Sequence, residues 1–147
     1  DYTYIVDGPI YHPDKVVRYS SLDLIKGIHP GVSVMIFMIK LALWMGIDTL
    51  YLTGLDFDFK VPNHSQTEEK IYNNTVIISN GEHNHFHPDY RKPGEKWTYP
   101  KMGEQKEEFT MIRWKTENSG SKIFNASRTT KLSVFDRVHF DTLINTT

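Results

Sequence analysis

Hydrophobic residues follow one another almost without interruption from residue 32 to residue 45. The run VSVMIFMIKLALWM is apolar on nearly every face of a helix, which predicts a buried helix with cover on both sides. Pro30 and Gly31 precede this run, and Gly46 follows it where helices commonly end on glycine. The next apolar run, Thr49 to Thr53, has the composition of a strand in the middle of a sheet.

A second helix and a second strand are predicted in the C-terminal half. Residues 101–118 place a buried stripe on one side of a helix, and Ser-Gly at 119–120 ends it. KIFNA at 122–126 predicts a strand, and the apolar spacing at 132–144 predicts a short helix on the sheet edge. At the other end of the chain, YTYIV at 2–6 predicts a further strand.

These elements follow the order strand, helix, strand, helix, strand. Because right-handed crossovers make such strands parallel, we expect a Rossmann-like α/β domain of three layers with a mainly parallel sheet. The 147 residues fit one domain of ordinary size. Between the two main halves, SQTEEKIYN at 65–73 predicts a short helix, and the prolines and glycines of 81–100 predict a long loop.

The amino-acid composition argues against several kinds of partner and binding site. The chain has no cysteine, which excludes disulfides and thiolate zinc sites. A formal net charge of −1 gives no reason to expect nucleic acid as a partner. The longest apolar run contains Lys40 and is too short to span a bilayer, so no transmembrane segment is expected. We expect a cytoplasmic protein, with peripheral attachment at the inner membrane surface as the alternative.

The stretch GEHNHFHPDY at residues 81–90 carries three histidines at alternate positions. On an extended backbone His83, His85 and His87 face the same way and could bind a divalent metal. The glycine and the proline of the stretch favour a loop, in which a neutral imidazole can take a proton from a sugar hydroxyl near pH 7. A polar loop with one structural histidine is the third interpretation. Asp89 in the same loop is a further catalytic candidate.

Polar residues also stand where the predicted strands end, and ligands bind at the carboxyl ends of parallel strands. Gly54 and Asp56 follow the strand at 49–53, where a carboxylate can accept hydrogen bonds from a ligand or cap a turn. Asn125 and Ser127 follow the last strand and can contact a base or a ribose, although an ordinary turn uses the same residues.

Gly31 and Ser33 stand at the start of the buried helix. Free amides at a helix N-terminus suit a phosphate or a carboxylate, but every helix has such an end. The sequence contains no P-loop, no G-x-G-x-x-G and no serine nucleophile elbow.

The helix–strand unit GVSVMIFMIKLALWMGIDTLYLTGLDFDF resembles the signature of bacterial sialyltransferases and their relatives in surface-polysaccharide and flagellin modification. In that family a turn of small residues opens a buried helix, a glycine ends it, and the strand closes in Gly-x-Asp-Phe. The stretch HFHPDY resembles the family's histidine–aromatic loop, and FNAS resembles its strand ending in Asn-x-Ser. The resemblance covers residues 31–58, with looser matches at 84–90 and 123–143.

The resemblance implies inverting transfer of a sialic acid-like sugar from a nucleotide sugar, CMP-linked in the sialyltransferases, to a glycan acceptor. It implies that no metal or other cofactor is needed, and that His85 or His87 is the general base. The residues that it places on the donor and phosphate side are Gly31, Ser33, Asp56, Tyr90 and Tyr99.

Members of this family usually begin with a strand and a Gly-Asn-Gly-type turn, whereas the chain has Asp-Gly-Pro at 7–9. We therefore expect residues 1–147 to be the C-terminal part of such a domain, without its N-terminal nucleotide-binding segment. A missing half and an aromatic content of 13% are compatible with a homo-oligomer. Two other functions stay open: a non-catalytic nucleotide- or sugar-binding module, and a metal-dependent hydrolase built on the histidines of 83–87.

Overall fold

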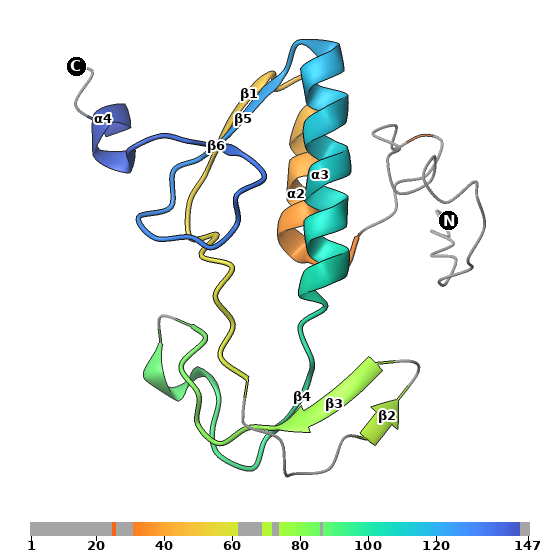
Figure 1. Cartoon of the computed structure of the whole chain (residues 1–147), viewed down its shortest axis with the longest axis vertical. Helices are drawn as coiled ribbons and strands as arrows, with labels where there is room; N and C mark the ends of the chain where they lie inside the picture. Colours follow the sequence, from red (N-terminus) through yellow and green to blue (C-terminus); the bar gives the residue numbers. More distant parts are fainter. Residues whose placement is uncertain (1–24, 26–30, 62–68, 72–73, 86, 145–147) are drawn as a thin grey trace. The chain divides into compact units, whose positions relative to one another are not determined.

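The structure is a computed structural model, and it describes residues 25, 31–61, 69–71, 74–85 and 87–144. The chain forms two compact units, in which unit 1 runs up to Asp56 and resumes at Met102, and unit 2 spans Phe57–Lys101. Unit 1 contains α-helices and a parallel sheet, and unit 2 contains an antiparallel sheet (Figure 1). The protein is thus a mixed α/β protein, as predicted. The strand predicted at 2–6 lies outside the described residues.

Helix α2 (Val34–Trp44) is the helix that the apolar run predicts. Gly46 follows it with a φ of 84°, a backbone conformation that glycine adopts without strain. The N–H of Gly46 donates to the carbonyl of Leu43 at 3.1 Å. The N–H of Ile47 donates to the carbonyl of Ala42 at 3.1 Å, so the last carbonyls of the helix have partners. Neither α2 nor any other helix in the described part of the chain has the length and apolar character that a membrane crossing needs.

Cover on both sides of α2 was predicted, but the described residues provide it on one side. The buried side consists of Ile36, Ile39 and Lys40. On the other side Val34 is 78% exposed and Met38 is 53% exposed. The hydrophobic pattern shows which faces a helix can bury, and it does not show whether a neighbouring element covers each of them.

The sheet of unit 1 is parallel, as the order of elements predicts. β1 (Thr49–Leu52) pairs with β5 (Lys122–Asn125), and β6 (Asp136–Arg137) pairs with the other side of β5. β1 is therefore an edge strand of the described sheet, although its apolar composition predicts a central one. Tyr51 and Phe124 stack on one face with ring centroids 5.3 Å apart, and Tyr51 is 49% exposed there.

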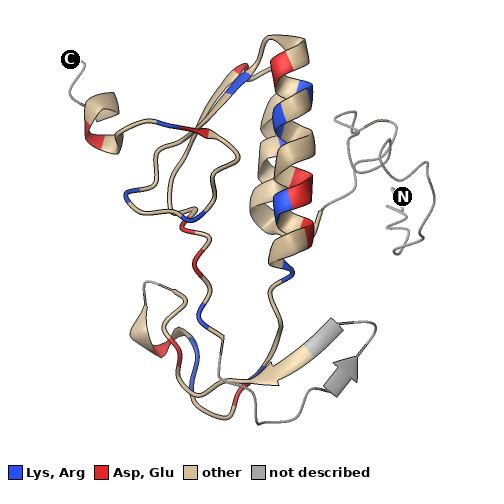
Figure 2. Ribbon diagram, in the orientation of Figure 1, with Lys and Arg blue, Asp and Glu red and all other residues tan. Residues whose placement is uncertain are grey.

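Helix α3 (Met102–Ser119) corresponds to the second predicted helix and contacts both α2 and β5. Its buried side includes Phe109 and Ile112, and Phe109 meets Phe135 edge-on with ring centroids 5.7 Å apart. Acidic and basic residues are both distributed along α3, whereas α2 has Lys40 as its one charged residue (Figure 2). The core of unit 1 also contains Ile36, Ile39, Leu52, Ile123, Ala126 and Leu132.

A buried ion pair joins the two long helices. Lys40 Nζ on α2 lies 3.4 Å from Glu108 Oε2 on α3, and the two side chains are 0% and 4% exposed. Burial lowers the pKa of Lys40 and raises the pKa of Glu108, and the attraction between the two charges opposes both shifts. Two charges taken out of water stabilise the fold only while they stay together, so the pair fixes α2 against α3.

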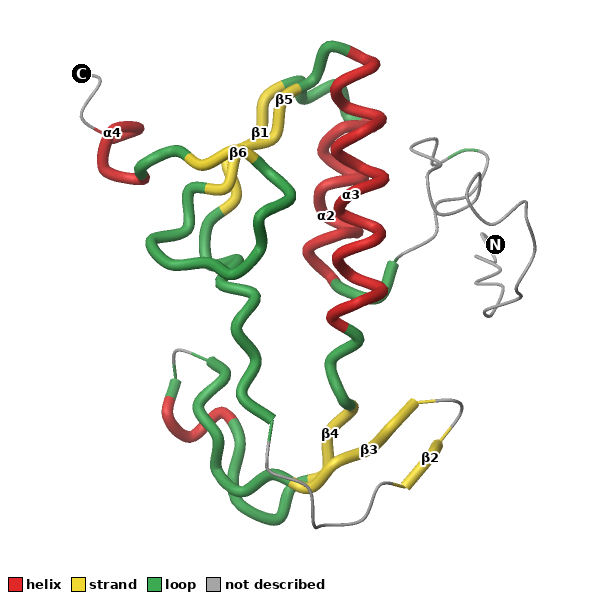
Figure 3. The backbone as a smooth tube through the Cα atoms, viewed as in Figure 1, coloured by secondary structure: helices red, strands yellow, loops and turns green. Residues whose placement is uncertain are grey.

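Unit 2 contains three antiparallel strands in the order β2-β3-β4 (Figure 3). These are β2 (Glu69–Ile71), β3 (Asn74–Ile78) and β4 (Lys96–Thr98). The helix predicted at 65–73 is wrong for residues 69–71, which pair with β3. Helix propensity is a weak preference in so short a polar window, and a strand partner next in sequence outweighs it.

The C-terminal tail was predicted as one short helix over 132–144, but only its end is helical. Leu132 and Phe135 enter the core from irregular backbone, β6 follows, and α4 (Phe140–Ile144) closes the described chain. A few apolar residues three apart fit an irregular segment as well as they fit a helix.

Replacing Glu108 by alanine should lower the free energy of unfolding by about 3–5 kcal/mol, because Lys40 keeps its buried charge without the partner carboxylate. Urea unfolding followed by circular dichroism measures the change. Glu107→Ala is the matched control, because Glu107 is the exposed acid next to it on α3; its effect should stay within about 0.5 kcal/mol. Added formate should restore part of the lost stability in Glu108→Ala and should have no effect on Glu107→Ala. Equal stability of the two variants would contradict the importance of the pair.

Candidate functional site

The carboxyl ends of β1 and β5 are joined by side chains that bond to the backbone. Ser127 Oγ accepts the N–H of Leu55 at 2.8 Å, and Thr130 Oγ1 donates to the carbonyl of Leu55 at 2.7 Å. Asn125 Oδ1 accepts the N–H of Ser127 at 3.0 Å, and Asn125 Nδ2 donates to Thr130 Oγ1 at 3.2 Å. Asn125 is 0% and Ser127 is 2% exposed. Both predicted ligand contacts therefore make bonds within the protein that fix the chain after β1.

Gly54 and Asp56 lie on either side of the backbone that these bonds hold. Gly54 has a φ of 70°, and a Cβ there would meet no atom within 4 Å. The carbonyl of Asp56 accepts the N–H of Lys131 at 2.7 Å, while the Asp56 side chain is exposed. Asp56 is thus the predicted donor-side residue at this edge whose carboxylate reaches solvent.

The N-terminus of α2, which was predicted to suit an anion, lies against a carboxylate of the chain itself. Gly31 has a φ of 78°, and a Cβ there would lie only 2.6 Å from Glu108 Oε2. Hydrogen bonding from the Val32 backbone favours the charged form of Glu108, against the larger effect of burial on its pKa. Ser33 is the N-cap residue, with an extended backbone and no side-chain cap bond. A ligand phosphate at this helix end would meet Glu108.

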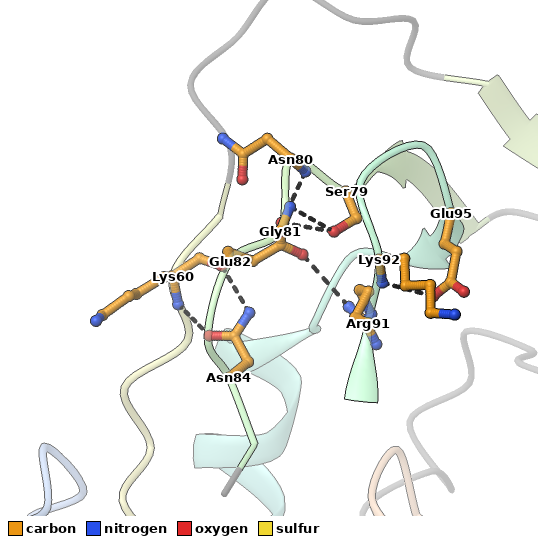
Figure 4. A network of polar contacts seen from close by, with 9 residues as sticks. All are labelled: Lys60, Ser79, Asn80, Gly81, Glu82, Asn84, Arg91, Lys92 and Glu95. Atoms are coloured by element: carbon orange, nitrogen blue, oxygen red, sulfur yellow. Dashed lines mark hydrogen bonds and ion pairs between the residues drawn. The ribbon is translucent and has the colours of Figure 1, made fainter. Parts of the chain in front are cut away.

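The histidine loop lies between β3 and β4 in unit 2, and hydrogen bonds fix it at both ends (Figure 4). Asn84 Oδ1 accepts the N–H of Lys60 at 2.6 Å, and Asn84 Nδ2 donates to the carbonyl of Lys60 at 2.7 Å. Near β3 the N–H of Ser79 donates to the carbonyl of Glu95 at 2.8 Å. The N–H of Gly94 donates to the carbonyl of Ser79 at 2.8 Å. The loop predicted at 81–100 is wrong for residues 96–98, which form β4 and pair with β3.

Glu82 and Arg91 meet inside this loop (Figure 4). Glu82 Oε2 accepts hydrogen bonds from Ser79 Oγ at 2.9 Å and from the N–H of Asn80 at 3.0 Å. Glu82 Oε1 lies 3.7 Å from Arg91 Nη1. The Arg91 guanidinium carbon lies 3.9 Å from the centroid of the Trp97 ring. Burial acts to raise the pKa of Glu82, but the hydrogen bonds to its carboxylate and the charge of Arg91 lower it overall.

His85 and Tyr90 pack ring against ring. Their ring centroids are 3.7 Å apart and their planes are tilted by 35°. Both side chains also reach solvent, and Tyr90 is 59% exposed. Partial burial lowers the pKa of His85, and the positive charge of Arg91 lowers it further. This shift favours the uncharged imidazole, which is the form that can accept a proton.

His87 has a different environment in the same loop. Its Nδ1 accepts the N–H of Asp89 at 3.2 Å, at the start of the 3-10 turn η1 (Pro88–Tyr90). Asp89 is exposed in that turn, and Tyr99 is 44% exposed just after β4. The structure thus brings four predicted residues together in one loop: His85, His87, Asp89 and Tyr90.

The three histidines do not converge on a common point. Within the residues that the structure describes, no three His, Asp or Glu side chains are arranged to hold a metal ion. The metal interpretation required an extended strand, whereas residues 82–85 have loop backbone and His87 begins a turn.

Sequence reasoning missed Glu82 and Arg91 in this loop and Trp97 in β4. The sequence offered one indication, because Glu82 and Arg91 carry opposite charges on either side of the three histidines. Their spacing fits no regular element, so neither their pairing nor the stacking of Arg91 on Trp97 follows from the sequence. At the sheet edge Thr130 was missed for the same reason, since it bonds to Leu55 from 75 residues away.

Comparisons with protein-family models, with curated proteins and with solved structures found no match. The contacts of the described residues therefore carry the functional inference.

Replacing Ser127 by alanine should lower the free energy of unfolding by about 1–3 kcal/mol, because the buried N–H of Leu55 loses its acceptor. Ser133→Ala is the control, since Ser133 is exposed in the same segment. Urea unfolding compares the two variants. A Ser127→Ala protein of unchanged stability that has lost ligand binding would contradict this result and would support a direct contact between Ser127 and the ligand.

Proposed function

We propose that the protein transfers a sialic acid-like sugar from a nucleotide sugar to a hydroxyl group of a glycan, with His85 as the general base. The observation that carries the proposal is the state of His85. Its ring packs on Tyr90 in a loop with fixed ends, and its lowered pKa favours the uncharged imidazole. The resemblance of residues 31–58 to bacterial sialyltransferases supports the substrate class.

Two histidines of the loop were candidates for the base, and the contacts favour His85. The Nδ1 of His87 already accepts the backbone N–H of Asp89, so protonation at that atom would break the bond that starts η1. His85 has no such bond to the backbone among the described contacts, and its packing on a ring keeps an imidazole edge accessible.

In the proposed reaction the acceptor hydroxyl gives its proton to a ring nitrogen of His85 while its oxygen bonds to the anomeric carbon of the sugar. The bond from that carbon to the phosphate oxygen breaks, and the nucleotide leaves with the electron pair. The sugar configuration is inverted, because one displacement takes place. Tyr90 and Tyr99 are the proposed hydroxyl donors to the leaving phosphate, and no metal takes part.

The fold of unit 1 supports the nucleotide-binding part of the proposal. The parallel sheet with α2 and α3 is compatible with part of a Rossmann-like domain, in which ligands bind at the carboxyl ends of the strands. Asp56 has an exposed carboxylate at that edge. We place the reaction in the cytoplasm, where nucleotide sugars are made.

A second candidate is a non-catalytic sugar-binding module. Two observations favour it. Asn125 and Ser127 are used within the protein, and Glu108 occupies the N-terminus of α2. The exposed rings of Tyr90 and Tyr99 would still offer apolar faces to a sugar. This candidate predicts sugar binding that survives the loss of all three loop histidines.

His85→Ala should reduce sugar transfer by about 100- to 10,000-fold, the usual contribution of a general base. His83→Ala is the control, because His83 is an exposed histidine two residues away, and it should retain activity. Mass spectrometry of a glycan acceptor incubated with CMP-sialic acid measures transfer, and thermal shift measures donor binding. Binding without transfer by the unchanged protein would favour the module. No shift with any CMP-, UDP- or GDP-linked sugar would contradict both candidates.

The rate should also depend on pH in a defined direction. His85 acts only when unprotonated, and its pKa lies below the ordinary value of 6.5. The value of kcat/KM should therefore rise with pH on the acid side and become constant before neutrality. A profile that still rises steeply between pH 7 and pH 8 would mean that another group accepts the proton.

A further inference from the structure

We propose that Arg91 is the positioning residue for His85: it is held by Glu82 and Trp97, and it keeps His85 in place as the unprotonated acceptor of the substrate proton. The catalytic meaning of this role rests on the proposed function. The contacts themselves, and the protonation of His85 that they control, can be measured without any activity.

Arg91 is fixed from two sides. Its guanidinium lies over the Trp97 ring at 3.9 Å from the centroid, within the range of a favourable cation–π contact. Its Nη1 faces Glu82, whose side chain is 5% exposed and is held by Ser79 Oγ and the N–H of Asn80. The Arg91 side chain is itself only 17% exposed. A long and flexible side chain is thereby restricted to one position.

Glu82 does not fully neutralise this guanidinium. The 3.7 Å between Glu82 Oε1 and Arg91 Nη1 is longer than a hydrogen bond. Neither of these two buried atoms has a hydrogen-bond partner among the described residues. The other carboxylate oxygen of Glu82 is engaged by Ser79 and Asn80. The positive charge of Arg91 therefore still acts on its surroundings, where it disfavours a second cation.

The group that this charge reaches is His85. Tyr90, whose ring packs on His85 at 3.7 Å, directly precedes Arg91, so the backbone that is fixed through Arg91 also fixes the ring beneath the imidazole. The pKa of His85 is lowered first by burial and second by the charge of Arg91. The other titratable residues of this loop are Glu82, His83, His87, Asp89, Tyr90, Lys92 and Glu95. Among the charged groups of the described chain, Arg91 is the one that shifts His85.

The contacts of Arg91 thus affect both the orientation of His85 and its protonation. Trp97 and Glu82 hold Arg91, and Arg91 anchors the turn that presents Tyr90 to His85. A proton added to His85 would bring a second cation next to a guanidinium that is incompletely neutralised. The imidazole therefore stays available as a base and keeps its orientation on Tyr90.

The decisive experiment is an NMR titration of the purified protein with isotope-labelled histidine, in which His85→Gln identifies the His85 signal. In Arg91→Gln the midpoint of the His85 titration should move to higher pH. Lys92→Gln is the matched control, because it removes the same charge one residue further along from an exposed side chain, and its midpoint should equal that of the unchanged protein. Equal midpoints in Arg91→Gln and the unchanged protein would overturn the proposal, as would the same shift in both variants.

Two further measurements keep the test valid if Arg91→Gln does not fold. Glu82→Gln removes the nearby negative charge and leaves Arg91 less neutralised, so the His85 midpoint should move to lower pH. Salt should move the midpoint of the unchanged protein upwards, since the Debye length falls to about 3 Å at about 1 M salt and charges farther apart are screened. A Glu82→Gln midpoint that moves upwards, or a midpoint of the unchanged protein that salt moves downwards, would show that Arg91 does not act on His85.

The transfer assay separates this role from the proposed function. In an active protein, Arg91→Gln should shift the acid limb of the kcat/KM profile to higher pH by the same interval as the NMR midpoint, and kcat at alkaline pH should fall because the imidazole loses its fixed orientation on Tyr90. Absence of transfer by the unchanged protein would remove the proposed function and leave the NMR result to decide on Arg91. A transfer profile and an NMR midpoint that are both unchanged in Arg91→Gln would overturn the positioning role.

Discussion

The packing of unit 1 depends on the carboxylate of Glu108, which helix α3 brings to the N-terminus of helix α2. Helix α2 has no acidic residue in its first turn, and Glu108 of α3 supplies the negative charge that a helix N-terminus favours. The same carboxylate meets Lys40 in the core. Because both charges are buried, a shift of either helix would leave a charge without its partner. β5 follows α3 after a short turn, so the central strand is positioned through this contact as well.

The elements of unit 1 could be predicted where the evidence in the sequence is local. The apolar run and its closing glycine predict α2, and the stripe of residues 101–118 predicts α3. The burial of Glu108 could not be predicted, because an acid on a helix usually faces solvent and its partner stands 68 residues away. The exposed side of α2 and the strand β2 were missed because both depend on which neighbours pack or pair with them.

The residues of the candidate site also divide into those that the sequence predicts and those that it does not. His85 and Tyr90 could be named as candidates because residue types alone mark them as chemically capable. Arg91 was not, because its effect on His85 arises from stacking and charge in three dimensions. Asn125 and Ser127 were singled out because polar side chains at strand ends can bind ligands. The backbone at the same strand ends also needs hydrogen-bond partners, and the sequence does not distinguish the two uses.

The position of unit 2 within the chain has a consequence for how the protein folds. β1 and β5 pair Thr49 with Lys122, which are 122 − 49 = 73 residues apart. Closing such a segment costs entropy before the parallel strands gain any contact, and this makes their pairing slow. Unit 2 lies inside that segment, and its strands pair with their neighbours in sequence. Once these hairpins have formed, less free chain remains to be closed. We therefore expect early pairing within unit 2 to speed the assembly of a sheet to which the described residues of unit 2 contribute no strand.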